Sequence, residues 1–290
     1  MQDIDEMFTQ NVDKTFYHYT GISSLLGISN SKCLWASNIY YMNDSREVIE
    51  ACDILDQVIF EKISQKESTS LDVVFLKQLQ NWLNNCRTTT YNIFVFSLSE
   101  EPSLLSQWRS YTPHGKGLSI GFSAEFIKNI MTASKLKLAK CIYDKEEQKI
   151  VLLSLVNKFL YSFNKEFDTI DTSDMHPSQS YHRWLEKFRG NVLQVLSIIK
   201  HNAFKEEAEW RLISPYYPKY TVDNIKYREG ASMLVPYIEL PLGEVKPYFE
   251  KVILGPSQHQ NLSMSALSMF LSNQNLCNAT VNCVLPYREW

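Results

Sequence analysis

The chain has 290 residues, 44% of them hydrophobic, so it can bury a large core as one big domain or two small ones. A net charge of −3 and a pI of about 6.1 exclude a strongly basic nucleic-acid-binding protein, although a local basic channel stays open. No run of about 18 apolar residues suits a membrane span, and residues 1–10 contain no apolar leader segment. The six cysteines form no CxxC pair, so we expect reduced thiols, no metal site and a cytoplasmic protein.

The predicted strands are rich in β-branched and aromatic residues, and the predicted helices repeat apolar residues at helical spacing. In chain order, the strands are 15–20, 34–37, 92–99, 118–122, 136–143, 210–214, 233–240, 251–254 and 279–285. In the same order, the helices are 22–28, 48–63, 70–86, a short one within 102–111, one starting at 123, 146–163, 181–199 and 263–271. Asn43-Asp44-Ser45 and Ser70 are typical residues before a helix start.

These strands and helices do not alternate regularly, which favours an α+β fold over a doubly wound parallel sheet. The chain shows no internal repeat and no convincing linker. We therefore expect a single α+β domain over residues 1–290, with a helical insertion at about 145–200 that contains a polar loop at 168–180.

Two predicted strands carry polar side chains in apolar surroundings. His18 lies between two tyrosines in TFYHYT, where it either donates to a ligand carbonyl or ribose hydroxyl or is a core histidine with a backbone partner. Ser97 and Ser99 alternate with Leu98, so both hydroxyls point to one face of their strand. Those hydroxyls need partners, supplied by the surrounding sheet or by a polar ligand.

An acidic segment precedes a third strand. If this strand begins near Ala208, Glu207 and Glu209 share one face and lie close to Arg211. Adjacent carboxylates raise each other's pKa unless a cation compensates them. One carboxylate could then orient a hydroxyl while the other acts as a base or stabilises a cationic transition state; the alternative is a solvated acidic face.

Arg109 and Lys116 are the basic residues of a glycine-containing segment that either binds phosphates or forms an exposed turn. The GxxxxGK[ST] pattern of a P-loop is absent, as are GxSxG, HExxH and a GxGxxG followed by a distant acid. The sequence therefore excludes the standard hydrolases, zinc enzymes and Rossmann dehydrogenases.

Seven blocks in the same order resemble the family DUF2971, from Phe16 to Arg288. The blocks are FYHYTG, LWASNIYYMNDSRE, VFSLSEEPSLLSQWRSY, GKGLSIGF, EEAEWRLI, KVILGP and LPYR. The family name implies no activity.

The order of His18, Ser97-Leu98-Ser99 and Glu207-Ala208-Glu209 also resembles the motifs of ADP-ribosyltransferases, with Leu98 in place of the usual central threonine. This resemblance implies a mixed or antiparallel split β-sheet with peripheral helices, and NAD as a substrate. It implies that Glu209 is the catalytic residue that holds the nicotinamide ribose, and that Glu207 orients the nucleophile. His18 would hold the ribose and the nicotinamide amide, while the two serines support the site.

The resemblance also implies a set of NAD-binding residues that hold, stack on or pair with parts of the dinucleotide. They are His18, Tyr19, Thr20, Trp35, Tyr41, Ser97, Ser99, Trp108, Arg109 and Arg211. The implied acceptor is a macromolecule, either a protein or a nucleic acid. Such proteins often act as bacterial toxins or phage-defence effectors, which implies an antitoxin or a complex subunit as a partner.

Two other hypotheses remain open. The chain is alternatively a non-catalytic binding or sensor module of a regulatory complex, which needs no catalytic geometry. It is alternatively a metal-dependent nuclease in which Glu47, Glu207 and Glu209 converge on a magnesium ion. The geometry that separates these hypotheses is whether His18, Ser97 and Glu209 line one cleft.

Overall fold

The computed structural model describes residues 7–8, 12–42, 46–113, 116–166, 183–218 and 223–283. The strands are β1 (Phe16–Gly21), β2 (Cys33–Asn38), β3 (Phe94–Ser99), β4 (Gly117–Phe122), β5 (Lys137–Lys140), β6 (Glu209–Ile213), β7 (Ile225–Glu229), β8 (Leu234–Pro241), β9 (Phe249–Leu254) and β10 (Cys277–Asn282). The α-helices are α1 (Ile22–Ser31), α2 (Glu47–Ser64), α3 (Leu71–Thr88), α4 (Leu105–Tyr111), α5 (Ala124–Ser134), α6 (Lys145–Glu166), α8 (Arg189–Leu196) and α9 (Gln260–Asn273). Two 3₁₀ helices are η2 (Ile39–Tyr41) and η4 (Asn202–Glu207).

The strands form one mixed sheet in the order β10-β9-β4-β1-β3-β2-β8-β7, and β6 joins it on β3 with β5 beyond. Only β9 and β10 run parallel among the described pairs. The sheet splits at β3, because β2 pairs with its Phe94–Val95 end and β1 with Ser99 at its other end. The α+β class and the mixed sheet are confirmed.

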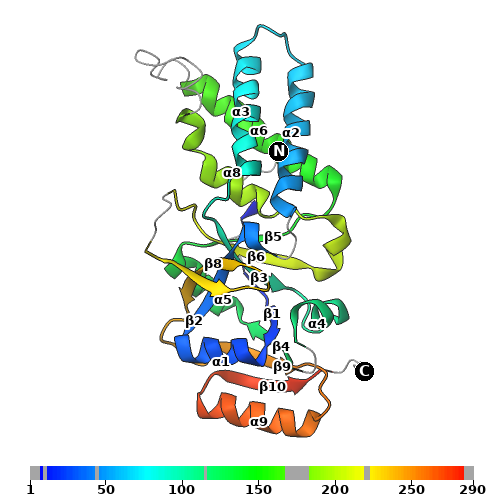
Figure 1. Cartoon of the computed structure of the whole chain (residues 1–290), viewed down its shortest axis with the longest axis vertical. Helices are drawn as coiled ribbons and strands as arrows, with labels where there is room; N and C mark the ends of the chain where they lie inside the picture. Colours follow the sequence, from blue (N-terminus) through cyan, green and yellow to red (C-terminus); the bar gives the residue numbers. More distant parts are fainter. Residues whose placement is uncertain are drawn as a thin grey trace.

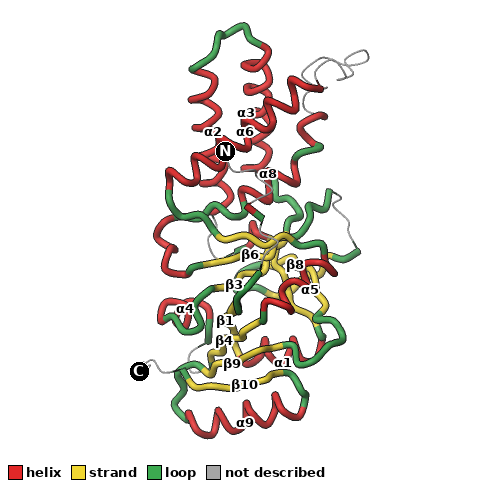
Figure 2. Tube along the Cα trace, turned by 180° about the vertical axis from the view of Figure 1, so that it is seen from behind, coloured by secondary structure: helices red, strands yellow, loops and turns green. Residues whose placement is uncertain are grey.

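Helices cover the sheet in two groups (Figure 1). The helices α2, α3, α6 and α8 lie together at one end of the molecule and share one apolar core, which includes Val95 and Ile213 of the sheet. A second core lies between the sheet and the group of α1, α5 and α9. Figure 2 shows the strands as a continuous band between the helices of the two ends.

The helical end is assembled from two separate parts of the chain. The segment 47–88 supplies α2 and α3, and the segment 145–196 supplies α6 and α8. The expected insertion at about 145–200 therefore accounts for only half of this helical layer. Among the described residues, no helix is both long and apolar enough to span a bilayer.

Most predicted elements are confirmed, and local signals explain why. Ser70 and Ser123 each accept a hydrogen bond from a backbone N–H of the first turn of α3 and α5, as N-cap residues do. The predicted cap Asn43-Asp44-Ser45, the loop 168–180 and the block LPYR lie outside the described residues.

The single helix predicted at 181–199 is wrong over its C-terminal part. The structure ends α8 at Leu196, and Ile199 then forms a parallel bridge with Ile142. The carbonyl of Ile198 accepts a hydrogen bond from the Ile142 N–H, and the Lys200 N–H donates to the Ile142 carbonyl. Pairing with a distant segment therefore overrides the local helical periodicity. The prediction missed β7, an edge strand whose exposed charged residues weaken the apolar alternation.

Candidate functional site

The site lies on the face of β3 and β6 that points to the helical end. Residues of even number, such as Phe96 and Leu212, enter the core with α1, α5 and α9, whereas Val95 and Ile213 enter the helical core. On the face that points to the helical core, the Val95–Ile213 pair is followed by two polar cross-strand pairs. These are Ser97 opposite Arg211 and Ser99 opposite Glu209.

This polar face lines a cavity of about 80 Å³. His18, Ser97 and Glu209, which are far apart in the sequence, all line it. The lining residues are Tyr17, His18, Tyr19, Met42, Glu47, Ser97, Leu98, Ser99, Gln107, Tyr111, Lys200, Glu207, Glu209 and Arg211. The separated motifs therefore meet at one place in the fold.

Glu209 is buried in a network of charged hydrogen bonds. Its Oε1 accepts from Arg211 Nε at 2.9 Å, and its Oε2 accepts from Arg211 Nη2 at 3.0 Å and from Lys200 Nζ at 2.5 Å. The thiol of Cys141 lies 3.7 Å from the same Oε2. Burial alone would raise the pKa of Glu209, but the charges of Arg211 and Lys200 outweigh it and lower the pKa to about 2. Glu209 is therefore a permanently ionised group at neutral pH.

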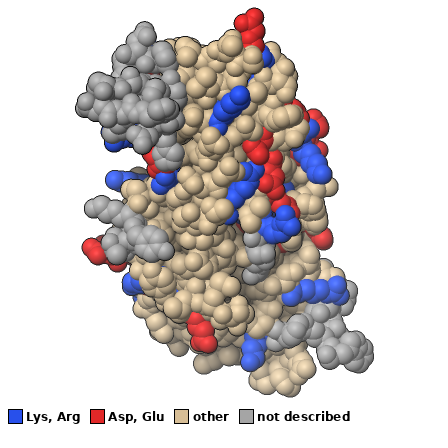
Figure 3. Space-filling view, turned by 45° about the horizontal axis from the view of Figure 1, so that its top comes forward, with Lys and Arg blue, Asp and Glu red and all other residues tan. Residues whose placement is uncertain are grey.

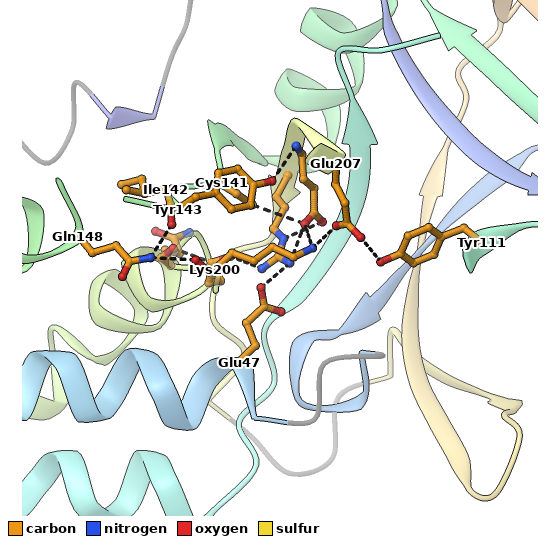
Figure 4. Close-up of polar contacts among 12 residues, drawn as sticks. Glu47, Tyr111, Cys141, Ile142, Tyr143, Gln148, Lys200 and Glu207 are labelled. Atoms are coloured by element: carbon orange, nitrogen blue, oxygen red, sulfur yellow. Dashed lines mark hydrogen bonds and ion pairs between the residues drawn. The ribbon is translucent and has the colours of Figure 1, made fainter. Parts of the chain in front are cut away.

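Glu207 is the last residue of η4, and one residue separates it from β6. The intervening Ala208 has a left-handed backbone with φ of 45°, and β6 begins only at Glu209. This turn brings the Glu207 carboxylate to the same ammonium as Glu209, since its Oε2 lies 2.5 Å from Lys200 Nζ. Its Oε1 accepts a hydrogen bond from the Tyr111 hydroxyl at 2.7 Å (Figure 4). Each Glu207 oxygen thus has one hydrogen-bond partner and keeps further acceptor capacity.

Lys200, which the sequence analysis missed, bridges the two carboxylates. Its side chain is only 6% exposed, and its pKa is raised because Glu209 and Glu207 outweigh the effect of burial. The Gln148 side chain donates to the Lys200 carbonyl at 2.8 Å and to the Ile142 carbonyl at 2.7 Å. The one sequence signal for Lys200 is its place as a charge directly after segment 192–199, which is apolar except for Gln194 and Ser197.

Glu47, the first residue of α2, completes the cluster. Its Oε1 accepts from Arg211 Nη2 at 2.7 Å, and its side chain is 2% exposed. Burial raises the pKa of Glu47 despite the charge of Arg211. With every group ionised, the three carboxylates of Glu47, Glu207 and Glu209 against the two cations Lys200 and Arg211 leave a formal charge of −1.

His18 lies at the point where the sheet splits. Its Nδ1 is 2.9 Å from the Ser97 carbonyl, and its ring stacks on Phe96 at a centroid distance of 4.4 Å. Because a carbonyl oxygen can only accept, Nδ1 carries the proton in this contact. Burial lowers the pKa of His18, so the ring is neutral at pH 7 and Nε2 is a hydrogen-bond acceptor.

The two serines of β3 have different roles. Ser99 Oγ donates to the Glu207 carbonyl at 2.8 Å and accepts from the Glu101 N–H at 3.1 Å, so its one donor is used in fixing the turn before β6. Ser97 Oγ is buried without a hydrogen-bond partner among the described residues. An unsatisfied buried hydroxyl in a cavity wall is available to a ligand.

Other predicted NAD-binding residues lie away from the cavity. Trp108 packs with Tyr19 in a small core, and its indole N–H donates to Ser103. Trp35 is 41% exposed and packs on Tyr237, while Arg109 is exposed on α4. Thr20 and Tyr41 do not line the cavity, whereas Tyr19 and Arg211 do.

The carboxylates do not form a metal site. Lys200 and Arg211 lie between Glu47, Glu207 and Glu209 and occupy the positions that a cation would take. The described residues contain no group of three or more His, Cys, Asp or Glu that could hold a metal ion. The arrangement thus gives no support to the nuclease hypothesis.

Comparisons with known proteins agree with one of the two resemblances. The family model described as "Protein of unknown function (DUF2971)" matches residues 107–212, which confirms the DUF2971 prediction over that segment. The segment contains most of α4 and all of β4 and β5, as well as Lys200, Glu207, Glu209 and Arg211. No curated protein and no solved structure matches the chain, so no comparison links it to the ADP-ribosyltransferases.

Proposed function

We propose that this chain, whose residues 107–212 match DUF2971, is an enzyme that cleaves the bond between nicotinamide and ribose in NAD. In this reaction the C–N bond electrons leave with nicotinamide, the ribose carbon gains a bond to an acceptor oxygen or nitrogen, and the acceptor loses a proton. The acceptor is a protein, a nucleic acid or water. The observation that supports the proposal is the meeting of His18, Ser97 and the Glu207/Glu209 pair at one cavity.

The charge of the cavity wall suits this chemistry. Cleavage develops positive charge on the ribose, as an oxocarbenium-like centre, and the carboxylates of Glu207 and Glu209 both lie in the cavity wall. Fixed charges in a buried wall act without reorganising during the reaction. A Glu207 carboxylate that faces the ribose would therefore stabilise a cationic transition state more than a neutral ground state.

Hydrogen bonding favours Glu207 as the residue that contacts the ribose. The sequence motif assigns that contact to Glu209, but Glu209 already accepts two hydrogen bonds from Arg211 and one from Lys200. Glu207 accepts one bond from Lys200 and one from Tyr111. We therefore assign substrate contact to Glu207 and a supporting electrostatic role to Glu209.

The size and lining of the cavity indicate how a dinucleotide would bind. A volume of about 80 Å³ corresponds to roughly five water positions, so only the reacting end of NAD would enter. The Nε2 acceptor of His18 suits an amide N–H or a ribose hydroxyl, and Ser97 Oγ offers a further hydrogen bond. The phosphates and adenosine would lie outside, over the surface near α4.

Figure 3 bears on the acceptor. On the face it shows, basic and acidic side chains are intermixed, and no broad patch of one sign forms. This face therefore lacks the clustered cations that nucleic acid needs, and together with the net charge of −3 this favours a protein acceptor or water. In a cell such an enzyme would act in the cytoplasm as a toxin or phage-defence effector, held in check by an antitoxin or a complex subunit.

The test is release of nicotinamide from NAD by the purified chain, measured by chromatography with water, protein and nucleic acid as acceptors. We expect Glu207→Gln to reduce the rate by about 100-fold or more, the scale of losing a positioned electrostatic contact. Glu206→Gln is the matched control, because Glu206 is the exposed neighbour outside the cavity. No nicotinamide release with any acceptor would refute the proposal, and NAD binding without release would favour the binding-module hypothesis.

A further inference from the structure

The segment that carries Lys200 is held by an unusual backbone clamp. Gln148 is 2% exposed, and its single amide nitrogen donates to the carbonyls of both Ile142 and Lys200. The Lys200 N–H in turn donates to the Ile142 carbonyl at 3.0 Å. The clamp therefore fixes the main chain at Lys200 from α6, independently of the ion pairs of the side chain.

The side chain of Lys200 then spans the interior to the carboxylates. Figure 4 shows Gln148 on one side of Lys200, with Glu207 and Tyr111 on the other. The ammonium lies 2.5 Å from one oxygen of Glu207 and 2.5 Å from one oxygen of Glu209. One cation thus sets the separation of the two carboxylates, because both must approach it to stay hydrogen-bonded.

We infer that Lys200, clamped by Gln148, is a positioning residue that fixes the orientation of Glu207 against the ribose. The inference rests on the proposed function for its catalytic consequence. Two of the three N–H donors of the Lys200 ammonium are directed to Glu207 and Glu209, so the role inferred for Lys200 acts through these carboxylates. A displaced ammonium would let Glu207 rotate toward Tyr111, and misplacement by about 1 Å of a reacting group costs on the order of 100-fold in rate.

The first experiment compares kcat and KM for Gln148→Leu and the parent chain. This variant keeps the charge of Lys200 and removes only the clamp, so we expect kcat to fall on the order of 10-fold with KM changed less than about twofold. Gln194→Leu is the matched control, because Gln194 is also buried and donates to a backbone carbonyl, that of Ser214, outside the cavity. An unchanged kcat, or equal losses in both variants, would overturn the inference.

The second experiment needs no turnover. In carboxyl-labelled protein, NMR titration of Glu209 in Lys200→Met should show a pKa higher than in the parent chain, because one of the two charges that lower it is gone. Lys205→Met, an exposed lysine of η4, should leave the Glu209 titration unchanged. Lys200→Arg keeps the positive charge, so the pKa of Glu209 should stay close to that of the parent chain.

The two experiments separate the possible failures. A parent chain that releases no nicotinamide, combined with a shifted Glu209 titration in Lys200→Met, would refute the proposed function and leave the positioning role of Lys200 standing. An unshifted titration would refute the positioning role whatever the turnover. If Lys200→Met does not fold, the kinetic comparison of Gln148→Leu and Gln194→Leu decides the inference.

Discussion

Two glutamates, one in β6 and one just after β3, each pair with two cations, yet their surroundings differ. Glu209 pairs with Lys200 and Arg211, whose side chains are 6% and 1% exposed. Glu100, directly after β3, pairs with Lys14 and Lys140, whose side chains are 44% and 51% exposed. The Glu100 carboxylate also accepts from the indole N–H of Trp210, the neighbour of Glu209 that points to the opposite face of the strand.

This comparison shows how burial changes the contribution of an ion pair to stability. Around Glu100, water screens the charges, so the pairs contribute at most about 1 kcal/mol to the free energy of unfolding. Around Glu209, burial weakens the screening by solvent, so removing one partner leaves a buried charge poorly compensated. Removing the charges of the Glu209 cluster from water costs free energy, and the exposed ion pairs of Glu100 avoid this cost. This cost favours a functional role for the buried cluster.

The largest expected effect is that of Arg211→Met. Arg211 donates to Glu209, to Glu47 and to the Ser197 carbonyl, so its loss leaves two carboxylates without their main cation. We expect the free energy of unfolding to fall by about 3–5 kcal/mol, measured by urea denaturation. Lys140→Met, which removes a surface partner of Glu100, should cost less than about 1 kcal/mol. Equal losses would contradict the distinction between the two clusters.

The next effect is acid destabilisation through Glu209. Its pKa is lowered from 4.5 to about 2, so it contributes stability at pH values above 4.5 that is lost as the pH falls toward 2. The shift corresponds to about 3 kcal/mol, seen as a fall in the free energy of unfolding over that window. In Glu209→Gln, the free energy of unfolding should fall less between pH 4.5 and pH 2. An unchanged fall in that variant would show that other carboxylates dominate the acid destabilisation.

The sequence was sufficient to select most of the carboxylates and hydroxyls at this site. Period-2 alternation placed Ser97 and Ser99 on one face, and the short acidic segment before β6 identified Glu207 and Glu209. Such patterns are local, so they survive folding whenever the strand forms as predicted. Most strands and helices followed from local signals of the same kind.

The site features that could not be predicted from the sequence depend on contacts between distant segments. Lys200 reaches the cavity because its chain leaves a helix to pair with Ile142, which no local pattern indicates. Tyr111, the last residue of α4, reaches Glu207 because α4 packs against η4. Trp35 has the right chemistry to stack on a ligand, but β2 turns it outward onto Tyr237.

A smaller effect is expected for Glu47→Gln. The raised pKa of Glu47 means that the folded state favours its protonated form, so stability is fully present below the unfolded pKa and falls as the pH rises through the folded pKa. Glutamine mimics the protonated form and leaves the two carboxylates of Glu207 and Glu209 balanced by Lys200 and Arg211. We therefore expect a change of about 1 kcal/mol or less at neutral pH, with a flatter pH dependence in thermal unfolding. A loss as large as that of Arg211→Met would show that Glu47 is ionised and required.

The smallest effect is expected for Glu100→Gln. The variant loses the attraction between the carboxylate and the two lysines Lys14 and Lys140, but the glutamine carbonyl can still accept the hydrogen bond from Trp210. The free energy of unfolding should fall by at most about 1 kcal/mol at low ionic strength, and the difference from the parent chain should shrink further in about 1 M salt, where the Debye length is near 3 Å. Salt should leave the effect of Arg211→Met almost unchanged, because ions do not enter the buried cluster. A salt response of equal size in both variants would mean that solvent reaches Glu209, and the electrostatic role assigned to the cavity wall would then fail with it.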